Sequence, residues 1–173
     1  MVGNKNRLYV ALYPSGVVNN EERMYHWAFL IGPKAEKGSA VGGTRYHVKN
    51  TPFGGWQYEE RPVPDVRTTG TLLVRITVAK ITDEARLIEI FRSVPVVQND
   101  PNWRCRTWLA QALAAIAADG TAVGTSVLDW ATIEQKARQY AAQKTAEGRY
   151  GSGANLSVAR PTFDLMEGKE VIA

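Results

Sequence analysis

The sequence predicts one α+β domain in which an antiparallel β-sheet packs against helices, and three observations support this prediction. Apolar runs of strand length, separated by turns that contain glycine and proline, fill the first half of the chain. From about residue 82 the apolar residues instead recur at helical spacing. The length of 173 residues, with 45% hydrophobic and 22% charged residues, suits a single globular domain. We therefore expect one domain over residues 1–150 and a mobile or loosely docked tail over residues 151–173.

The first half of the chain contains five strand candidates. The run from Met24 to Ile31 is mostly apolar on both faces, so we expect it to be a central strand that is covered on each side. The segment that contains His47 follows it after a glycine-rich connection. The five candidates cover residues 8–13, 24–31, 44–50, 56–60 and 71–79.

Three helices are expected in the second half. Asp83 or Thr82 can cap the first, and Gly120 is suited to end the second. Ser126 or Asp129 lies near the start of the third. The expected ranges run from Thr82 or Asp83 to before Pro95, from about Pro101 or Trp103 to Gly120, and from about Leu128 to Glu147.

Cys105 is the only cysteine, and it lies at the start of the second expected helix. The helix dipole and the neighbouring Arg104 and Arg106 would favour its thiolate. The thiol also shares a helix face with Leu109 and Leu113, which is typical of a packed, inert cysteine. The sequence leaves both interpretations open.

The chain has two histidines, His26 and His47, both upstream of Cys105. His26 alternates into an apolar strand, where a histidine is either a hydrogen-bonded core residue or a base. An imidazole within reach of Cys105 would complete a nucleophile–base pair.

The segment from Tyr25 to Gly32 resembles the strand that carries the general base in circularly permuted papain-like proteins. These are the NlpC/P60-type group, which includes lecithin retinol acyltransferase. The resemblance covers roughly residues 24–116 and implies a permuted papain-like fold. It also implies that His26 is the base, that His47 orients it, and that Cys105 is the nucleophile.

Two features depart from this group. The acyltransferase branch has an Asn-Cys-Glu-His-Phe-like segment, whereas this chain has the sequence Arg104 to Trp108 around its cysteine. The gap between His26 and His47 is also longer than in that branch. The Tyr-His-Trp strand and the Cys-Arg-Thr-Trp helix are similar to those of fungal proteins without an assigned function.

The implied activity is that of a cysteine-dependent hydrolase or acyl or peptidyl transferase that forms a Cys105 thioester. An amide, ester or isopeptide bond in a small molecule or a peptide would be the substrate. The Cys105 backbone N–H, with Gln98 as a possible second donor, would stabilise the oxyanion. Trp27, Trp103 and Arg104 are the expected substrate contacts.

A non-catalytic binding module on the same scaffold is the alternative, with a pocket lined by tryptophans. Nucleic-acid binding is not expected, because the net charge of +4 is spread along the chain rather than gathered in a basic stripe. The aromatic lining of such a binding module would come from Trp27, Trp56, Trp103 and Trp108.

Neither a metal nor another cofactor is expected. A single cysteine excludes an internal disulfide, and the chain has neither zinc-motif spacing nor a Rossmann or P-loop glycine motif. The apolar run from Leu8 to Tyr13 is too short for a signal peptide, and no stretch reaches the ~20 apolar residues of a membrane span. We expect a cytoplasmic protein without a membrane anchor. The sequence does not predict the oligomeric state.

Overall fold

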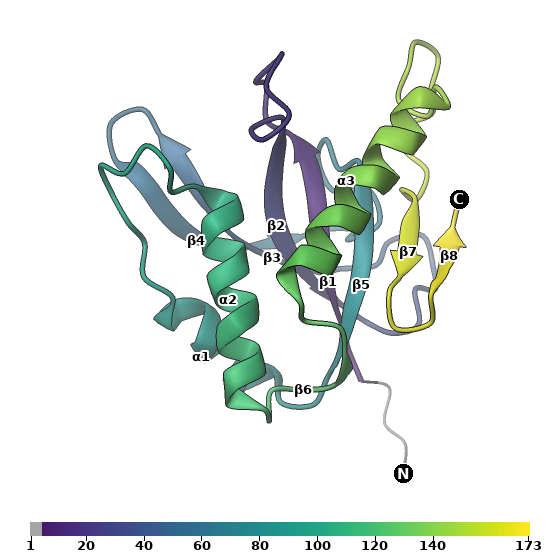
Figure 1. Ribbon diagram of the computed structural model, residues 1–173. Helices are drawn as coiled ribbons and strands as arrows, with labels where there is room; N and C mark the ends of the chain where they lie inside the picture. Colours follow the sequence, from purple (N-terminus) through teal and green to yellow (C-terminus); the bar gives the residue numbers. More distant parts are fainter. Residues whose placement is uncertain (1–4) are drawn as a thin grey trace.

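The first half of the chain forms strands because its apolar runs are short and are interrupted by glycine and proline turns (Figure 1). The computed structural model describes residues 5–173. The strands of this range are β1 (Arg7–Pro14), β2 (Tyr25–Gly32), β3 (Gly43–Thr51), β4 (Gly55–Val63), β5 (Val74–Ile81), β6 (Val123–Ser126), β7 (Thr162–Asp164) and β8 (Lys169–Ile172). Its helices are α1 (Glu84–Ser93), α2 (Cys105–Asp119) and α3 (Trp130–Ala146). The five expected strands and three expected helices are confirmed, with bounds shifted by a few residues.

Within residues 5–173 the strands form one eight-stranded sheet in the order β4-β3-β2-β1-β5-β7-β8, with β6 paired to β5. Neighbouring strands are antiparallel except β5 and β7, which are parallel. The expected α+β class with a mainly antiparallel sheet is therefore confirmed.

The sheet has a buried core on each face. Helices α2 and α3 lie over one face, where Phe29 packs with Trp108 at a ring separation of 5.8 Å (Figure 1). On the other face Leu30 packs with Val41 and Val66 from the connecting segments. Burial on both faces makes β2 the central strand that its apolar sequence predicts.

Side-chain and glycine caps fix the helix ends. Asp83 and Asp129 accept hydrogen bonds from backbone N–H groups in the first turns of α1 and α3. Gly120 ends α2 in the left-handed conformation with φ of 76°, which glycine adopts without steric cost. Ser126, the other expected start signal for the third helix, lies in β6 instead.

The segment 151–173, which we expected to be a mobile or loosely docked tail, contributes two strands to the sheet instead. β7 pairs with β5 along Arg75 to Thr77, and β8 pairs with β7. Thr162 and Arg160 are almost fully buried. The sequence did not predict these two strands, because each has only three or four residues and little periodic pattern, and they follow a glycine-rich start.

The sheet divides at one end into two separate hairpins. β1 and β2 stay paired to Pro14 and Tyr25, and β3 and β4 stay paired to Thr51 and Gly55. Between them, β2 and β3 pair only over Phe29–Ile31 and then diverge. The space between the hairpins opens beside the start of α2.

Candidate active site

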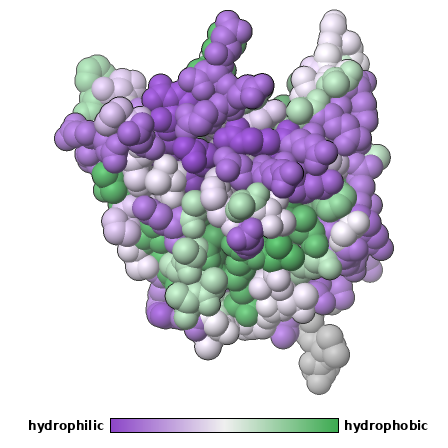
Figure 2. Space-filling view, viewed as in Figure 1, coloured by the Kyte–Doolittle hydropathy of each residue, from purple (hydrophilic) through white to green (hydrophobic). Residues whose placement is uncertain are grey.

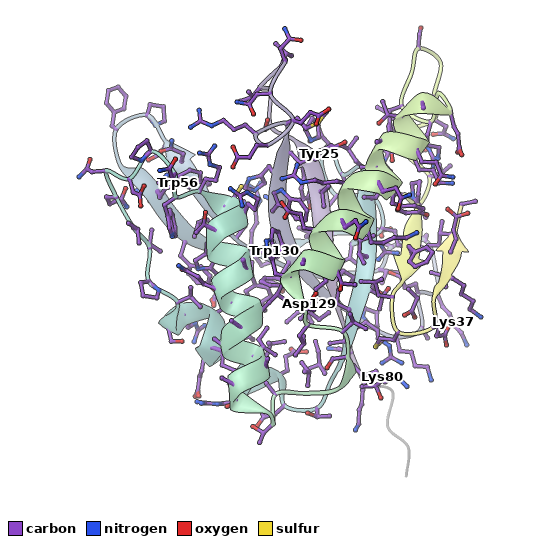
Figure 3. All side chains as sticks on the ribbon, in the orientation of Figure 1. Tyr25, Lys37, Trp56, Lys80, Asp129 and Trp130 are labelled. Carbon is purple, nitrogen blue, oxygen red and sulfur yellow. The ribbon has the colours of Figure 1, made fainter. Side chains whose placement is uncertain are left out.

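A cavity of about 720 Å³ occupies the gap between the two hairpins. Tyr25 from the first hairpin and Trp56 from the second lie at the same end of the sheet, on the two sides of the cavity (Figure 3). Trp103 from the segment before α2 and Cys105 at the first position of α2 close a third side. Hydrophilic residues gather over this end of the molecule (Figure 2). Three chain segments therefore build this cavity, and both polar and apolar side chains line it.

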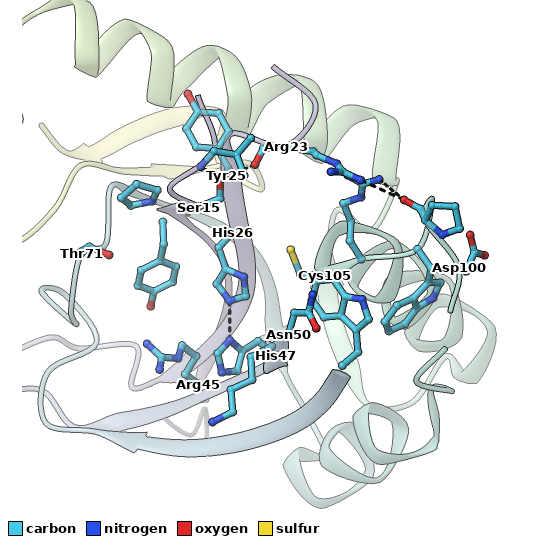
Figure 4. A pocket seen from close by; sticks show the side chains of 18 residues that line it. Ser15, Arg23, Tyr25, His26, Arg45, His47, Asn50, Thr71, Asp100 and Cys105 are labelled. Atoms are coloured by element: carbon cyan, nitrogen blue, oxygen red, sulfur yellow. Dashed lines mark hydrogen bonds between the residues drawn. The ribbon is translucent and has the colours of Figure 1, made fainter. Parts of the chain in front are cut away.

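A hydrogen-bonded chain of three side chains crosses from one hairpin to the other. His26 Nε2 lies 2.7 Å from His47 Nδ1, and His47 Nε2 lies 2.9 Å from Glu59 Oε1 (Figure 4 shows the first bond). Glu59 is the partner of His47 in the β3–β4 register, so strand pairing alone brings these two side chains together. Lys49 holds the second carboxylate oxygen of Glu59.

The hydrogen bonds among Glu59, His47 and His26 determine the tautomers of both histidines. Hydrogen bonds from His47 and Lys49 lower the pKa of Glu59 to about 2, so its carboxylate can only accept a hydrogen from His47 Nε2. A neutral His47 then has a free lone pair on Nδ1 and accepts from His26 Nε2. This leaves the Nδ1 lone pair of a neutral His26 free to act as a base.

Cys105 lies at the first position of α2 and lines the same cavity as His26 and His47. Its sulfur is on the side of the cavity next to His26 (Figure 4). The backbone N–H groups of Trp27, the residue after His26, and of Arg106 approach the thiol. The structure thus brings together the three residues that the sequence predicted as nucleophile, base and orienting group.

Cys105 and His26 are both neutral at neutral pH. Burial raises the pKa of the Cys105 thiol, against the smaller opposite effects of the N–H groups of Trp27 and Arg106. Burial, followed by the charges of His47 and Arg45, lowers the pKa of His26 to about 3. Burial also lowers the pKa of His47, more than the Glu59 bond raises it. The site holds a thiol beside an imidazole rather than an ion pair.

The two arginines beside the cysteine are paired with an acid. Arg104 lies 3.0 Å from Glu22, and Arg106 forms a second ion pair with the same carboxylate. The single carboxylate offsets part of their combined charge, so they favour the thiolate less than the sequence suggested. Glu22 thereby ties the β1–β2 connection to the start of α2.

The remaining predicted site residues are divided between the cavity and other roles. Trp103 and Arg104 line the cavity, and so does Trp56. Trp27 is fully buried under α3, with its ring 5.1 Å from that of Trp130, because it alternates with His26 along β2. Trp108, from the proposed aromatic lining, is likewise fully buried in the core.

Gln98 does not line the cavity. Its Oε1 accepts a hydrogen bond from the Trp56 N–H at 2.9 Å, and its Nε2 donates to the Trp56 carbonyl at 2.6 Å. Both ends of the amide are therefore engaged, and we assign Gln98 a structural role in place of oxyanion binding.

Glu59 is the site residue that sequence reasoning missed. It lies in a mixed, half-exposed strand, where a glutamate is normally a surface residue. A hairpin register drawn through the turn at Thr51 to Gly55 would have paired it with His47.

Within residues 5–173 no group of three or more His, Cys, Asp or Glu side chains is arranged to hold a metal ion. None of the helices of this range combines the length and the apolar character that crossing a bilayer requires.

The comparison with protein families gives one match, which covers residues 5–172 and is described as a family of unknown function (DUF6914). The chain belongs to this family. No curated protein and no solved structure matches the chain. The DUF6914 match spans both hairpins, α2 and the C-terminal strands, so the whole candidate site lies inside the family domain.

Proposed function

We propose that this protein is a cysteine-dependent hydrolase or acyl or peptidyl transferase with a permuted papain-like arrangement. The observation that carries the proposal is that Cys105, His26 and His47 line one cavity, with His26 bonded to His47 and His47 bonded to Glu59. The order base, orienting residue, nucleophile along the chain and the position of the nucleophile at a helix start support the permuted papain-like interpretation.

The reaction begins with attack of the Cys105 sulfur on the carbonyl carbon of an amide, ester or isopeptide bond. His26 Nδ1 takes the thiol proton as the carbon–sulfur bond forms. His26 then returns this proton to the departing amine or alcohol as the bond to the leaving group breaks. Water or an acceptor then attacks the thioester carbonyl and gives its proton to His26. The carbon–sulfur bond breaks, the acyl product leaves, and His26 returns the proton to the Cys105 sulfur.

The remaining groups support this proton transfer. His47 and Glu59 are positioning residues, because they hold His26 in the tautomer with a free Nδ1. The backbone N–H of Cys105, at the N-terminal end of α2, is oriented to stabilise the oxyanion. Trp56 and Trp103, whose rings lie 5.7 Å apart, supply an apolar wall for a small-molecule or peptide substrate.

A non-catalytic binding module is the second candidate. The observation that favours it is the burial of the thiol, which is only 6% exposed and has a raised pKa. In that case Trp56 and Trp103 would bind a ligand without turnover.

The pH profile of Cys105 alkylation by iodoacetamide separates the two candidates, since the chain has one thiol. If His26 acts as base, we expect the parent to react about 100-fold faster at neutral pH than His26→Ala. The rate should stay level down to about pH 4, because the pKa of His26 is lowered to about 3.

Thr71→Ala is the matched control, because Thr71 lines the cavity but does not belong to the hydrogen-bonded chain. It should react like the parent. Equal rates in the parent and in a folded His26→Ala variant would contradict the catalytic proposal and favour the binding module.

A further inference from the structure

Arg45 differs from the other cations of the cavity in having no acidic partner. Lys49 is paired with Glu59, Arg104 with Glu22 at 3.0 Å, and Arg23 lies 4.0 Å from Glu22. Within residues 5–173 no carboxylate lies within 4.0 Å of the Arg45 guanidinium. Its positive charge is therefore available to a ligand.

The fold holds this guanidinium in a fixed place. Arg45 lies on β3 between two neighbouring strands, paired with Leu30 on β2 and with Arg61 on β4. Its guanidinium carbon lies 5.5 Å from the centre of the Tyr13 ring, and its Nε is buried without a hydrogen-bond partner. An arginine that is oriented by an aromatic ring loses little freedom when it binds an anion.

Arg45 also lies close to the proposed base. It is two residues before His47 on the same face of β3, and Figure 4 shows it beside His47, at the end of the histidine pair away from Cys105. Its charge opposes protonation of both histidines. A bound anion would offset the charge of Arg45 and so remove its effect on the protonation of both histidines.

We propose that Arg45 forms a carboxylate subsite, so that the substrate of this cavity is an acyl compound or peptide that carries a free carboxylate. This inference rests on the proposed function and names its substrate class. In the described part of the chain, Arg45 is the cavity-lining cation with no carboxylate nearby, since Lys49 is paired with Glu59 and Arg23 and Arg104 share Glu22. A guanidinium binds a carboxylate through two parallel hydrogen bonds.

The subsite also has a consequence for the chemistry. When a carboxylate is bound at Arg45, the imidazolium that His26 becomes after taking the thiol proton faces one positive charge fewer. The substrate with the right charge therefore eases the proton transfer that starts the reaction.

Two alkylating probes with equal reach test the subsite: N-iodoacetyl-β-alanine, which carries a carboxylate, and its neutral N-methylamide. At low ionic strength we expect the acid to alkylate Cys105 about tenfold faster than the amide, a preference that salt weakens. Arg45→Gln should abolish the preference, and Arg45→Lys should keep part of it.

Arg23→Gln is the control with the same loss of net charge, and it should keep the preference for the acid. A preference that survives in Arg45→Gln, or that is lost equally in Arg23→Gln, would overturn the subsite. The rate with the neutral amide reports separately on the proposed function. If the amide reacts independently of His26, the function fails, whereas a His26-dependent rate without acid preference contradicts the subsite alone.

Discussion

At the residue level, the chemistry of the site depends on which ring nitrogen of each histidine carries the proton. His47 is 5% exposed and lies between a carboxylate and a second imidazole, so its two nitrogens must divide the roles of donor and acceptor. The low pKa of Glu59 assigns the donor role to Nε2. Through His47, the charge of a residue that does not line the cavity determines which nitrogen of His26 can take a proton.

We predict that Glu59→Leu disturbs this order. Without an acceptor at Nε2, His47 can change tautomer, and the share of His26 with a free Nδ1 falls. We expect Cys105 alkylation to slow by about tenfold, the equivalent of one hydrogen bond. Nitrogen NMR shifts of both imidazoles should show mixed tautomers.

Glu59→Gln is the conservative companion, because its amide oxygen still accepts a hydrogen bond. It should restore most of the rate and the single tautomer. Unchanged nitrogen shifts in Glu59→Leu would show that Glu59 has no positioning role.

At the scale of elements, the site depends on two hairpins that separate and on the loop that fixes the start of α2 between them. The loop is anchored on β4 by the two hydrogen bonds of Gln98 to Trp56 and by the contact of Trp103 with the Trp56 ring. Gly55 makes room for this anchor, since a Cβ there would lie 2.4 Å from Gln98 Oε1. The position of Cys105 is thus set partly by residues outside α2.

We predict that Gln98→Ala loosens this anchor. It removes both hydrogen bonds to Trp56, so the free energy of unfolding should fall by about 1–2 kcal/mol. Urea unfolding measures this loss, and hydrogen exchange should show faster exchange of the Trp56 amide. Gln143→Ala, which removes an exposed contact on α3, should change neither. Full protection of the Trp56 amide in Gln98→Ala would refute the anchor.

At the scale of the whole molecule, burying two neutral histidines makes folding depend on pH. The pKa of His26 falls from 6.5 to about 3 on folding, and that of His47 is also lowered. Below pH 6.5 the unfolded chain binds protons that the native chain does not, so stability is complete above pH 6.5 and is lost as the pH falls. The lowered pKa of Glu59 adds a further loss below about pH 4.5.

We predict that urea unfolding between pH 7 and pH 4 shows this loss, with a slope of up to about 1.4 kcal/mol per pH unit for each histidine. His26→Gln should be less stable at neutral pH but should have the smaller slope. Equal slopes in the parent and in His26→Gln would mean that His26 is protonated equally in both states.

Local sequence patterns were enough to predict the α+β class, the five long strands, the three helices and the candidates His26, His47 and Cys105. This was possible because periodicity, turn residues, caps and rare residue types are local properties. The short strands β7 and β8 could not be predicted from the sequence, because they depend on pairing, of β7 with β5 and of β8 with β7, rather than on a pattern of their own.

Which polar residues contact one another depends on the three-dimensional fold. It paired Glu59 with His47, placed Gln98 on Trp56, buried Trp27 and left Arg45 without an acid. It also set the protonation of the site, since a pKa depends on burial and on neighbours that are distant in sequence. The His47–Glu59 pair follows from a hairpin register that the turn at Thr51 to Gly55 sets. The other contacts depend on the divergence of two hairpins and on packing between distant segments, which local sequence patterns do not specify.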